Sequence, residues 1–334
     1  PAAPPRRSSP RRCSRRPPAH LASRNVMNYD TVFDMIGRTP HVRLRMPGIE
    51  PDSVYLKLEG CNPTGSIKDR ACAFMIQSAI RSGELQPGMI ALDASSGNFA
   101  CALALYSRML GYEATVVVGS KLTQAKREFL EFAGATVYQV GDFTIQGNEF
   151  CRELVQREPE KYFFLDQLHN WLNPQAHYET TGPEILTEFP DVGMIVGSLG
   201  SGGTMLGVAE YVKQKSPSVR IIVVETASGS RMPGAGTFVD GDYVTPFITK
   251  GYNSGLFDDV VRVSEAEAHA AGRLLISQGV FCGLQTGAVV HAANASASGI
   301  GPGKPVVVIS GDSGWKNLDK LLTLRRTASG CSNA

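Results

Sequence analysis

GCNPTGSIKDR, residues 60–70, is the stretch of this sequence that most narrows the choice of fold and chemistry. It follows a short apolar run at 54–58 and opens a segment, 68–82, whose apolar spacing predicts a helix. Lys68 is therefore expected at a helix start, where the helix dipole and free backbone N–H groups attract anions. A partly desolvated lysine has a lowered pKa and can act as a nucleophile or base. Most lysines at helix starts are nevertheless solvated surface groups, and the phosphate-loop pattern GxxxxGK[ST] is absent.

Two further turns, each between an apolar run and a helical segment, carry glycines and hydroxyl side chains. In SSGN, residues 95–98, the hydroxyls and backbone N–H groups suit a carboxylate, although Ser and Asn are also ordinary helix caps. In GSGGT, residues 200–204, the glycines let the backbone close around a phosphate, and Ser201 and Thr204 can add hydroxyl donors. This loop suits a nucleotide phosphate or a tight turn equally well, and it does not fit the dinucleotide fingerprint GxGxxG. Ligands of open α/β sheets gather at such turns, at the carboxyl ends of strands.

Around these turns, short β-rich runs alternate with longer helical segments. Several of the runs are continuously apolar, as in strands that are covered on both faces, so the alternation predicts an α/β fold with parallel sheets. The expected strands are 54–58, 114–118, 136–140, 193–197, 220–225 and 305–309. The expected helices are 68–82, 98–110, 123–133, 144–157, 176–188, 204–214, 264–277 and 286–297.

Composition excludes several classes of protein. The chain has 334 residues, 43% hydrophobic and 19% charged, and no apolar run is long enough for a membrane span. Its net charge is +2, but residues 1–26 hold seven arginines and no acid, so the remainder has a net charge of −5 and gives no reason to expect nucleic-acid binding. The seven cysteines form no CxxC pair, which favours reduced thiols in the cytoplasm, and the six histidines lack metal-ligand spacing, so no metal is expected.

Residues 1–26 are rich in Pro, Arg, Ser and Ala and hold few large apolar side chains, so we expect a disordered basic extension. An Arg- and Ser-rich start without acids resembles an organelle transit peptide, but six prolines oppose the amphipathic helix that import requires. A tail that binds an acidic partner, or an extension upstream of a natural start at Met27, are the alternatives.

Taken together and in this order, NPTGSIKDR, SGN and GSGGT resemble the cysteine synthase and cystathionine β-synthase family. The resemblance runs from IGRTP, residues 36–40, to about Leu322, and includes HYETTGPE at 177–184. It implies the tryptophan synthase β-like fold, fold type II of the pyridoxal-phosphate enzymes: two open, twisted, mostly parallel sheets with flanking helices. It also implies pyridoxal 5′-phosphate as the cofactor.

The resemblance also implies a role for each matching residue. Lys68 would hold the cofactor as a Schiff base and move protons at the substrate α-carbon, and Asn98 would bind the ring hydroxyl. Ser313 would face the ring nitrogen, where a neutral hydroxyl suits β-elimination better than transamination, although Asp312 beside it leaves open which side chain does so. The phosphate would lie on Gly200, Ser201, Gly202, Gly203 and Thr204. The substrate would contact Ser95, Ser96, Gly97, Phe99, Gln167 and Gly251.

The activity implied is β-replacement on an O-activated L-serine, O-acetylserine or O-phosphoserine, through an α-aminoacrylate. Sulfide as the nucleophile would give cysteine. Two alternatives stay open: a specialised paralogue that uses an amine nucleophile to make a diaminopropionate-type amino acid, and a serine/threonine dehydratase. A degenerate, non-enzymatic paralogue is disfavoured because Lys68, Asn98 and GSGGT are intact.

Departures from the family pattern cluster at positions that would face the substrate. Phe99 stands where a small hydroxyl residue is usual, and His169 and Trp171 alter the usual QFxNPxN. GLQTG at 283–287 replaces GISSG, and after Ser313 the usual GERYL is changed. If the leaving group is a phosphate, a basic side chain near the pocket is expected, with Arg231 and Lys250 as candidates.

We expect two interleaved domains with the cofactor between them. Residues 62–170 would form a small α/β domain, 27–61 with 171–325 a large cofactor-binding domain, and 326–334 a flexible tail. The expected partners are a small amino-acid substrate and a second copy of the chain, because family members are usually homodimers. Neither a nucleic acid nor a membrane is expected.

Overall fold

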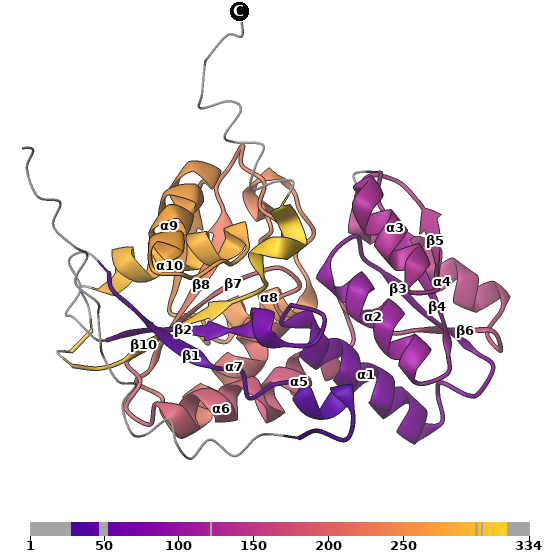
Figure 1. The fold of residues 1–334 in the computed structure, drawn as a ribbon, viewed down its shortest axis with the longest axis horizontal. Coiled ribbons are helices and arrows are strands. Elements are labelled where there is room, and N and C mark those ends of the chain that lie inside the picture. The colour runs from indigo at the N-terminus through magenta and orange to yellow at the C-terminus, as the bar shows by residue number, and fades with distance from the viewer. Residues whose placement is uncertain (1–27, 47–52, 121, 298–299, 302, 319–334) are drawn as a thin grey trace, which may run out of the picture.

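The computed structural model describes residues 28–46, 53–120, 122–297, 300–301 and 303–318, and these form two β-sheets with helices around them (Figure 1). The expected basic extension, 1–26, and the expected flexible tail, 326–334, lie outside the described residues.

The larger sheet has six strands, and all neighbouring pairs are parallel except β1 and β2. Its central strands come from distant parts of the chain, since β10 pairs with β2 on one side and with β7 on the other. In spatial order the strands are β1 (His41–Leu44), β2 (Val54–Leu58), β10 (Val306–Ser310), β7 (Met194–Ser198), β8 (Arg220–Thr226) and β9 (Asp259–Val263).

The smaller sheet has four strands, all parallel, from one continuous part of the chain. Their spatial order is β5 (Ala135–Gln139), β4 (Glu113–Val118), β3 (Ile90–Ala94) and β6 (Tyr162–Phe164). Parallel pairing needs a crossover between strands, and here each crossover from β3 to β6 carries a helix.

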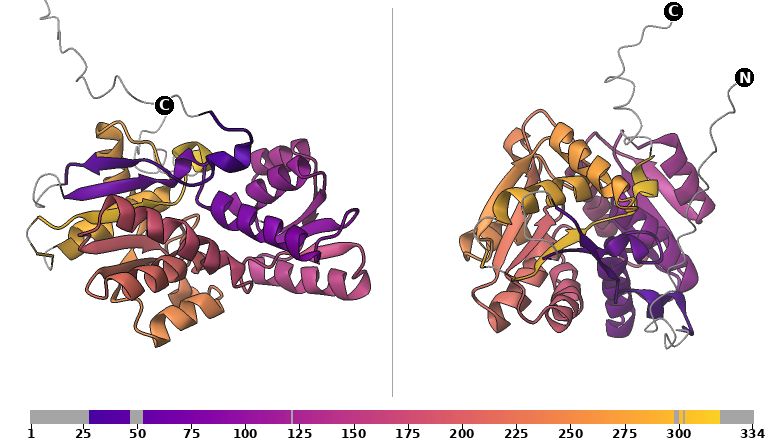
Figure 2. Two further views of the ribbon diagram at one scale, coloured as in Figure 1. Left: turned by 90° about the horizontal axis from the view of Figure 1, so that it is seen from below. Right: turned by 60° about the vertical axis from the view of Figure 1, so that its left-hand side comes forward.

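Helices cover both faces of each sheet, which explains why the strands are apolar throughout (Figure 2). Successive residues of a strand point to opposite faces: Val196 packs with α10, whereas Ile195 packs with α7 on the other side. The larger sheet is flanked by α5 (Leu172–Glu179), α6 (Thr181–Glu188), α7 (Gly203–Lys215), α8 (Pro246–Asn253), α9 (Glu265–Ser277) and α10 (Leu284–Ser296). The smaller sheet is flanked by α1 (Lys68–Ser82), α2 (Asn98–Met109), α3 (Gln124–Phe132) and α4 (Thr144–Arg157).

The expected fold class, two mostly parallel sheets with flanking helices, is confirmed. The single helix expected at 176–188 is wrong, because the chain breaks at Thr180 into α5 and α6. Pro183 explains the break: inside one helix it would lack the N–H that pairs with the preceding turn, whereas in the first turn of α6 none is needed. Four strands, β1, β3, β6 and β9, and the helix α8 were not among the expected elements, since their runs are brief and only partly apolar.

Four short 3₁₀ helices complete the described part: η2 (Val32–Met35), η3 (Glu59–Cys61), η4 (Phe238–Asp240) and η6 (Gly314–Asn317). No helix of the described part is both long and apolar enough to cross a lipid bilayer.

Candidate active site

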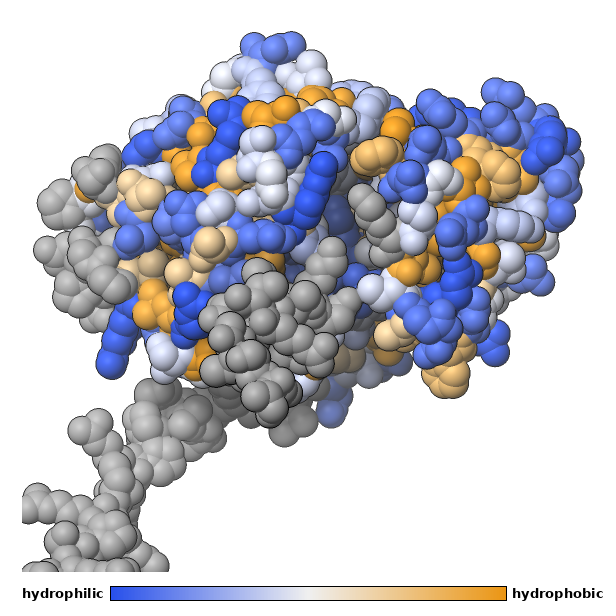
Figure 3. Space-filling view, turned by 90° about the horizontal axis from the view of Figure 1, so that it is seen from above, coloured by the Kyte–Doolittle hydropathy of each residue, from blue (hydrophilic) through white to orange (hydrophobic). Residues whose placement is uncertain are grey.

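A cavity of about 700 Å³ lies between the two sheets, at the carboxyl ends of β3, β7 and β10. Figure 3 shows the surface hollowed between the larger and the smaller body of the molecule. The turns 95–99 and 200–204 both face this cavity, together with Lys68 and Gln167. The cavity therefore occupies the position where open α/β sheets bind ligands.

Lys68 is the first residue of α1, and its side chain faces the cavity. Its Nζ donates to Oγ of Ser201 at 3.2 Å, which joins the start of α1 to the glycine loop. Burial lowers the pKa of Lys68 to about 8, and the nearby Asp93 only partly opposes this. A substantial fraction of the amine is therefore neutral near physiological pH, as a nucleophile or base requires.

The loop before Lys68 is held by Asp69, a buried carboxylate in the first turn of α1. It accepts hydrogen bonds from N and Oγ1 of Thr64, at 3.0 and 2.8 Å, and from N of Ser66 at 3.2 Å. The hydroxyl of Tyr106, from α2, donates to the same carboxylate. Gly65 has φ +85°, which favours glycine in this tight turn. The Asn-Pro-Thr-Gly-Ser motif thus forms a closed loop that fixes where Lys68 begins the helix.

A buried ion network clamps the same helix from the side of the larger sheet. Arg70 donates to Glu59 at 2.7 Å and to Glu184 of α6 at 2.8 and 2.7 Å. Lys57 of β2 donates to Glu184 at 2.7 Å. These charges balance one another in the interior, so removal of any single member would leave a buried charge unpaired.

The glycine loop 200–204 leaves no room for additional side chains. A Cβ atom on Gly203 would lie 2.3 Å from Oδ1 of Asn173, and one on Gly200 would lie 3.0 Å from the carbonyl oxygen of Gly234. Gly202 has φ +84° and immediately precedes α7, whose first backbone N–H groups have no partner within the helix. Such a loop exposes N–H donors and a helix N-terminus to the cavity, which is the arrangement that binds a phosphate.

His177 contacts Thr204, the last residue of this glycine loop. Its Nε2 lies 3.2 Å from Oγ1 of Thr204, and its Nδ1 lies 2.9 Å from Oγ1 of Thr181. Burial, with the positive charges of Arg70 and Lys68, lowers the pKa of His177 to about 3. The imidazole is therefore neutral and holds the Thr204 hydroxyl in place rather than carrying charge.

The turn 95–99 follows β3 and starts α2 at the opposite wall of the cavity. Gln167 lies beside it, but its amide Nε2 already donates to Oδ1 of Asp93 and to the carbonyl of Ala94, both at 3.2 Å. Burial raises the pKa of Asp93 well above its ordinary value. Gln167 therefore holds the end of β3 in place and lines the cavity.

Asn98 and Gln285 meet at the floor of the cavity around Asp312. Nδ2 of Asn98 donates to Oδ2 of Asp312 at 2.8 Å, and Nδ2 of Asn317 donates to the same oxygen at 3.0 Å. Burial raises the pKa of Asp312. Oε1 of Gln285, from α10, accepts from Oγ of Ser198 at 2.7 Å. Gln285 was missed at the level of the sequence. The signal for it was a polar side chain in GLQTG at a helix start, and the structure shows that this side chain is buried.

Three expected site residues, Gly203, Ser313 and Gly251, are not among those that line the cavity. Ser313 accepts the backbone N–H of Trp315 at 3.3 Å and caps η6. It does not line the cavity, whereas Gln285 and Gly311 do. Gly251 is buried in α8, where a Cβ atom would lie 2.1 Å from the ring of Phe257. Its small size is required by packing in α8.

The groups around the cavity fit pyridoxal phosphate. The partly neutral lysine amine matches the aldehyde of this cofactor, and the glycine-rich loop at a helix N-terminus matches its phosphate. The polar side chains at the floor match its ring. Oδ1 of Asn173, buried beneath the glycine loop, has no hydrogen-bond partner within the described ranges. No group of three His, Cys, Asp or Glu side chains suited to a metal ion occurs among the residues that the structure describes.

Comparison with known proteins agrees with this geometry. Residues 32–312 match the family described as "Pyridoxal-phosphate dependent enzyme". Cysteine synthase B of Pseudomonas aeruginosa is 35% identical over 273 residues, which is 80% of this chain and 89% of that protein. The crystal structure of O-ureido-L-serine synthase superposes with a TM-score of 0.81 at 27% identity, covering 92% of this chain and 98% of the other. O-acetylserine sulfhydrylase isoform 3 of Entamoeba histolytica gives a TM-score of 0.81 at 28% identity, covering 90% and 93%.

Proposed function

The chain belongs to the cysteine synthase and cystathionine β-synthase family of pyridoxal-phosphate enzymes, and on that premise we propose that its substrate is an O-activated L-serine. The enzyme catalyses β-replacement, so the proposal concerns the leaving group and the nucleophile. O-acetylserine and O-phosphoserine are the two donors considered. The observation that supports the proposal is the 3.2 Å contact between Lys68, whose pKa is lowered, and Ser201 in a glycine loop suited to a phosphate.

Pyridoxal phosphate, when bound, withdraws electrons from the α-carbon of an amino acid and so makes its proton acidic. Lys68 would hold this cofactor, and its amine would then remove and return the proton at the α-carbon. Gly200, Ser201, Gly202, Gly203 and Thr204 would hold the phosphate through backbone N–H groups and hydroxyls. The lowered pKa of Lys68 supports the role of base, because a permanently charged amine cannot accept a proton.

The floor of the cavity would hold the ring, with Asn98 beside its hydroxyl. For the ring nitrogen we propose Gln285 in place of Ser313, because Gln285 lines the cavity and Ser313 caps η6. The amide of Gln285 is neutral, so this exchange keeps an uncharged partner for the ring nitrogen, the feature that suits β-elimination.

The substrate carboxylate would lie at the start of α2, against Ser95, Ser96 and Gly97. Hydroxyls and the N-terminal end of a 12-residue helix favour an anion at this position. Phe99 is almost fully buried and lines the same wall, so it would limit the space beside the substrate β-carbon. Gln167, already bonded to Asp93, would fix the shape of this wall.

The experiment is to incubate the purified, cofactor-loaded enzyme separately with O-acetylserine and O-phosphoserine, with and without sulfide. Acetate or phosphate release and cysteine formation, both followed by mass spectrometry, are expected for at least one donor. Lys68→Ala should abolish both. Release from neither donor would overturn the proposal, and pyruvate formation without a nucleophile would identify a dehydratase instead.

An amine nucleophile is a second candidate, favoured by the size and lining of the cavity. Lys126 and Arg231 both line its outer part, and about 700 Å³ is in the range that accommodates whole organic ligands. An anionic amino acid could therefore enter as the nucleophile and give a diaminopropionate-type product. A panel of amino-acid nucleophiles offered with each donor tests this, and products from sulfide alone would exclude it.

We also propose that the enzyme is a homodimer of the cytoplasm. Large apolar side chains in contact with solvent support a second copy: Phe132 is 91% exposed and Trp315 is 74% exposed. Cys61, Cys72, Cys101, Cys151 and Cys282 are free thiols, which supports a reducing compartment. Light scattering of the purified chain and localisation of a tagged chain test the two parts, and a monomeric mass would overturn the first.

A further inference from the structure

Asp166, His169 and Tyr243 form a hydrogen-bonded row that crosses the edge of the cavity. Oδ1 of Asp166 lies 2.8 Å from Nδ1 of His169, and Nε2 of His169 lies 2.8 Å from the hydroxyl of Tyr243. The imidazole and phenol rings are tilted by 50° with centroids 5.6 Å apart. Asp166 and His169 follow β6 of the smaller sheet, whereas Tyr243 precedes α8 beside the larger sheet.

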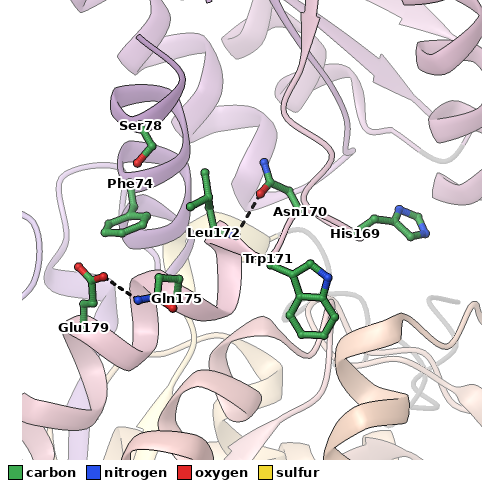
Figure 4. Close-up of a pocket in the computed structure, with 8 residues that line it drawn as sticks. All are labelled: Phe74, Ser78, His169, Asn170, Trp171, Leu172, Gln175 and Glu179. Carbon is green, nitrogen blue, oxygen red and sulfur yellow. Dashed lines mark hydrogen bonds between the residues drawn. The ribbon is translucent and has the colours of Figure 1, made fainter. Parts of the chain in front are cut away.

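Tyr243 and His169 open onto different spaces. Tyr243 lines the cavity that contains Lys68. His169 lines a separate surface pocket of about 630 Å³, between α1 and the segment that leads into α5, together with Phe74, Trp171 and Gln175 (Figure 4). The side chain of His169 is 25% exposed, so a proton that enters at the phenol can reach solvent there without returning through the cavity.

Further hydrogen bonds hold Asp166 and the segment that carries Tyr243. Asp166 has φ +54°, an uncommon conformation for a residue with a side chain, and its carboxylate accepts from Asn148 at 2.8 Å and from Arg152 at 3.0 Å. On the other side, Oγ1 of Thr245 donates to the carbonyl of Ser201 at 2.7 Å. The segment that carries Tyr243 is thus bonded to the glycine loop two residues further on, at Thr245.

The charged groups that face His169 are Asp166 and Arg152. Nη2 of Arg152 also lies 2.9 Å from Nδ1, so this nitrogen has a carboxylate and a guanidinium as neighbours. When Nδ1 donates to Asp166, the lone pair of Nε2 is free to accept the proton of Tyr243. After that transfer the imidazolium is stabilised by Asp166, as carboxylates stabilise the imidazolium in Ser–His–Asp sites.

We propose that Tyr243 and His169 activate the incoming nucleophile in the second half of the β-replacement, an inference that rests on the proposed function. The nucleophile's S–H or N–H bond breaks, its proton passes to the oxygen of Tyr243, and the phenol proton passes to Nε2 of His169. The freed lone pair forms the new bond to the substrate β-carbon. The electron pair displaced there ends in the new bond between the α-carbon and hydrogen, whose proton comes from Lys68. The imidazolium then releases its proton to water in the surface pocket.

Tyr243→Phe tests the first link, with two nucleophiles that differ in their need for a base. Bisulfide is already ionised near neutral pH, whereas 2-mercaptoethanol is mostly protonated, and only the thiolate attacks. We expect Tyr243→Phe to slow transfer to 2-mercaptoethanol about 100-fold and transfer to bisulfide less than about threefold. Release of the leaving group without a nucleophile should not change. Tyr138→Phe is the matched control, because Tyr138 is also 41% exposed and lies on β5, away from the cavity.

His169 acts through Tyr243, so its test needs a readout that a merely structural role would not move. In His169→Gln, the rate with 2-mercaptoethanol should rise about tenfold per pH unit near neutrality, in step with the thiolate, while the wild-type rate varies much less. In His169→Ala, added imidazole should restore the rate through the surface pocket.

The outcomes separate the two proposals. No leaving-group release by the wild-type enzyme would overturn the proposed function itself. Release together with equal losses for both nucleophiles in Tyr243→Phe, or with parallel pH profiles and no rescue by imidazole, would overturn the relay alone. Release by a wild-type enzyme that transfers to neither nucleophile would also overturn the relay.

Discussion

The amine of Lys68 donates to the hydroxyl of Ser201 at 3.2 Å, although the two residues are 133 positions apart in the chain. Lys68 starts α1, at the boundary between the two sheets, and Ser201 lies in the loop between β7 and α7 of the larger one. This contact brings the proposed cofactor-binding lysine and the proposed phosphate loop into one site. Each of the two can be tested by its own substitution.

The first prediction concerns the cost of burying Lys68 before the cofactor is attached. Burial lowers its pKa to about 8, below the ordinary value of 10.5. Below pH 8 the amine is charged in the folded and unfolded chains, and the cost of burial is fully present. Between pH 8 and 10.5 only the unfolded chain binds the proton, so the stability of the wild-type apoenzyme rises with pH. Lys68→Met should therefore stabilise the apoenzyme by about 3 kcal/mol at pH 7.

Urea unfolding of the two apoenzymes at several pH values measures this difference, which should shrink toward zero as the pH approaches 10.5. A difference that does not vary with pH would show that packing of the methionine, rather than the charge of the lysine, is responsible.

The second prediction compares two glycines. Gly203→Ala should destabilise the protein by about 2 kcal/mol or more and weaken cofactor binding, because its Cβ would lie 2.3 Å from Oδ1 of Asn173. Gly272→Ala in α9 is the matched control, since no atom lies within 4 Å of its Cβ. It should stabilise the helix by about 0.5–1 kcal/mol. Thermal unfolding and cofactor titration check both, and similar behaviour of the two variants would contradict the close packing of the loop.

The third prediction concerns His177. Its pKa is lowered to about 3 by burial, so between pH 3 and 6.5 the unfolded chain binds a proton that the folded chain does not. The stability of the wild-type protein is therefore lost as the pH falls through this range. His177→Gln should be about 1–2 kcal/mol less stable at pH 7, because the bonds to Thr181 and Thr204 are weakened. Its deficit should narrow as the pH falls from 6.5 toward 4, which denaturant titrations would show.

The fourth prediction decides between Gln285 and Ser313. If Gln285 faces the cofactor ring, Gln285→Ala should weaken cofactor binding about tenfold, which corresponds to the loss of one hydrogen bond, and should change the absorption spectrum of the bound cofactor. Ser313→Ala should leave both within about twofold of the wild type, because Ser313 caps η6. The reverse result would return the ring nitrogen to Ser313.

Much of the architecture could be read from local patterns. All six expected strands and most expected helices have counterparts in the structure, since apolar periodicity depends on which face of an element is buried. The family and its cofactor could likewise be inferred, because glycine loops and the lysine at a helix start are defined by short, contiguous motifs. The one expected helix that proved wrong, at 176–188, contained Pro183, a breaker visible in the sequence.

Taken by itself, the sequence determined the fold class, the order of the motifs and the lysine proposed to bear the chemistry, because backbone propensity and apolar periodicity are local properties. Only the tertiary structure decided that Gln285 rather than Ser313 lines the cavity and that His169 meets Tyr243. The physical reason is that a side chain's direction in a turn depends on backbone angles set by its neighbours. Contacts such as His169 with Tyr243 depend further on how two separately built sheets dock, and no local pattern encodes that distance.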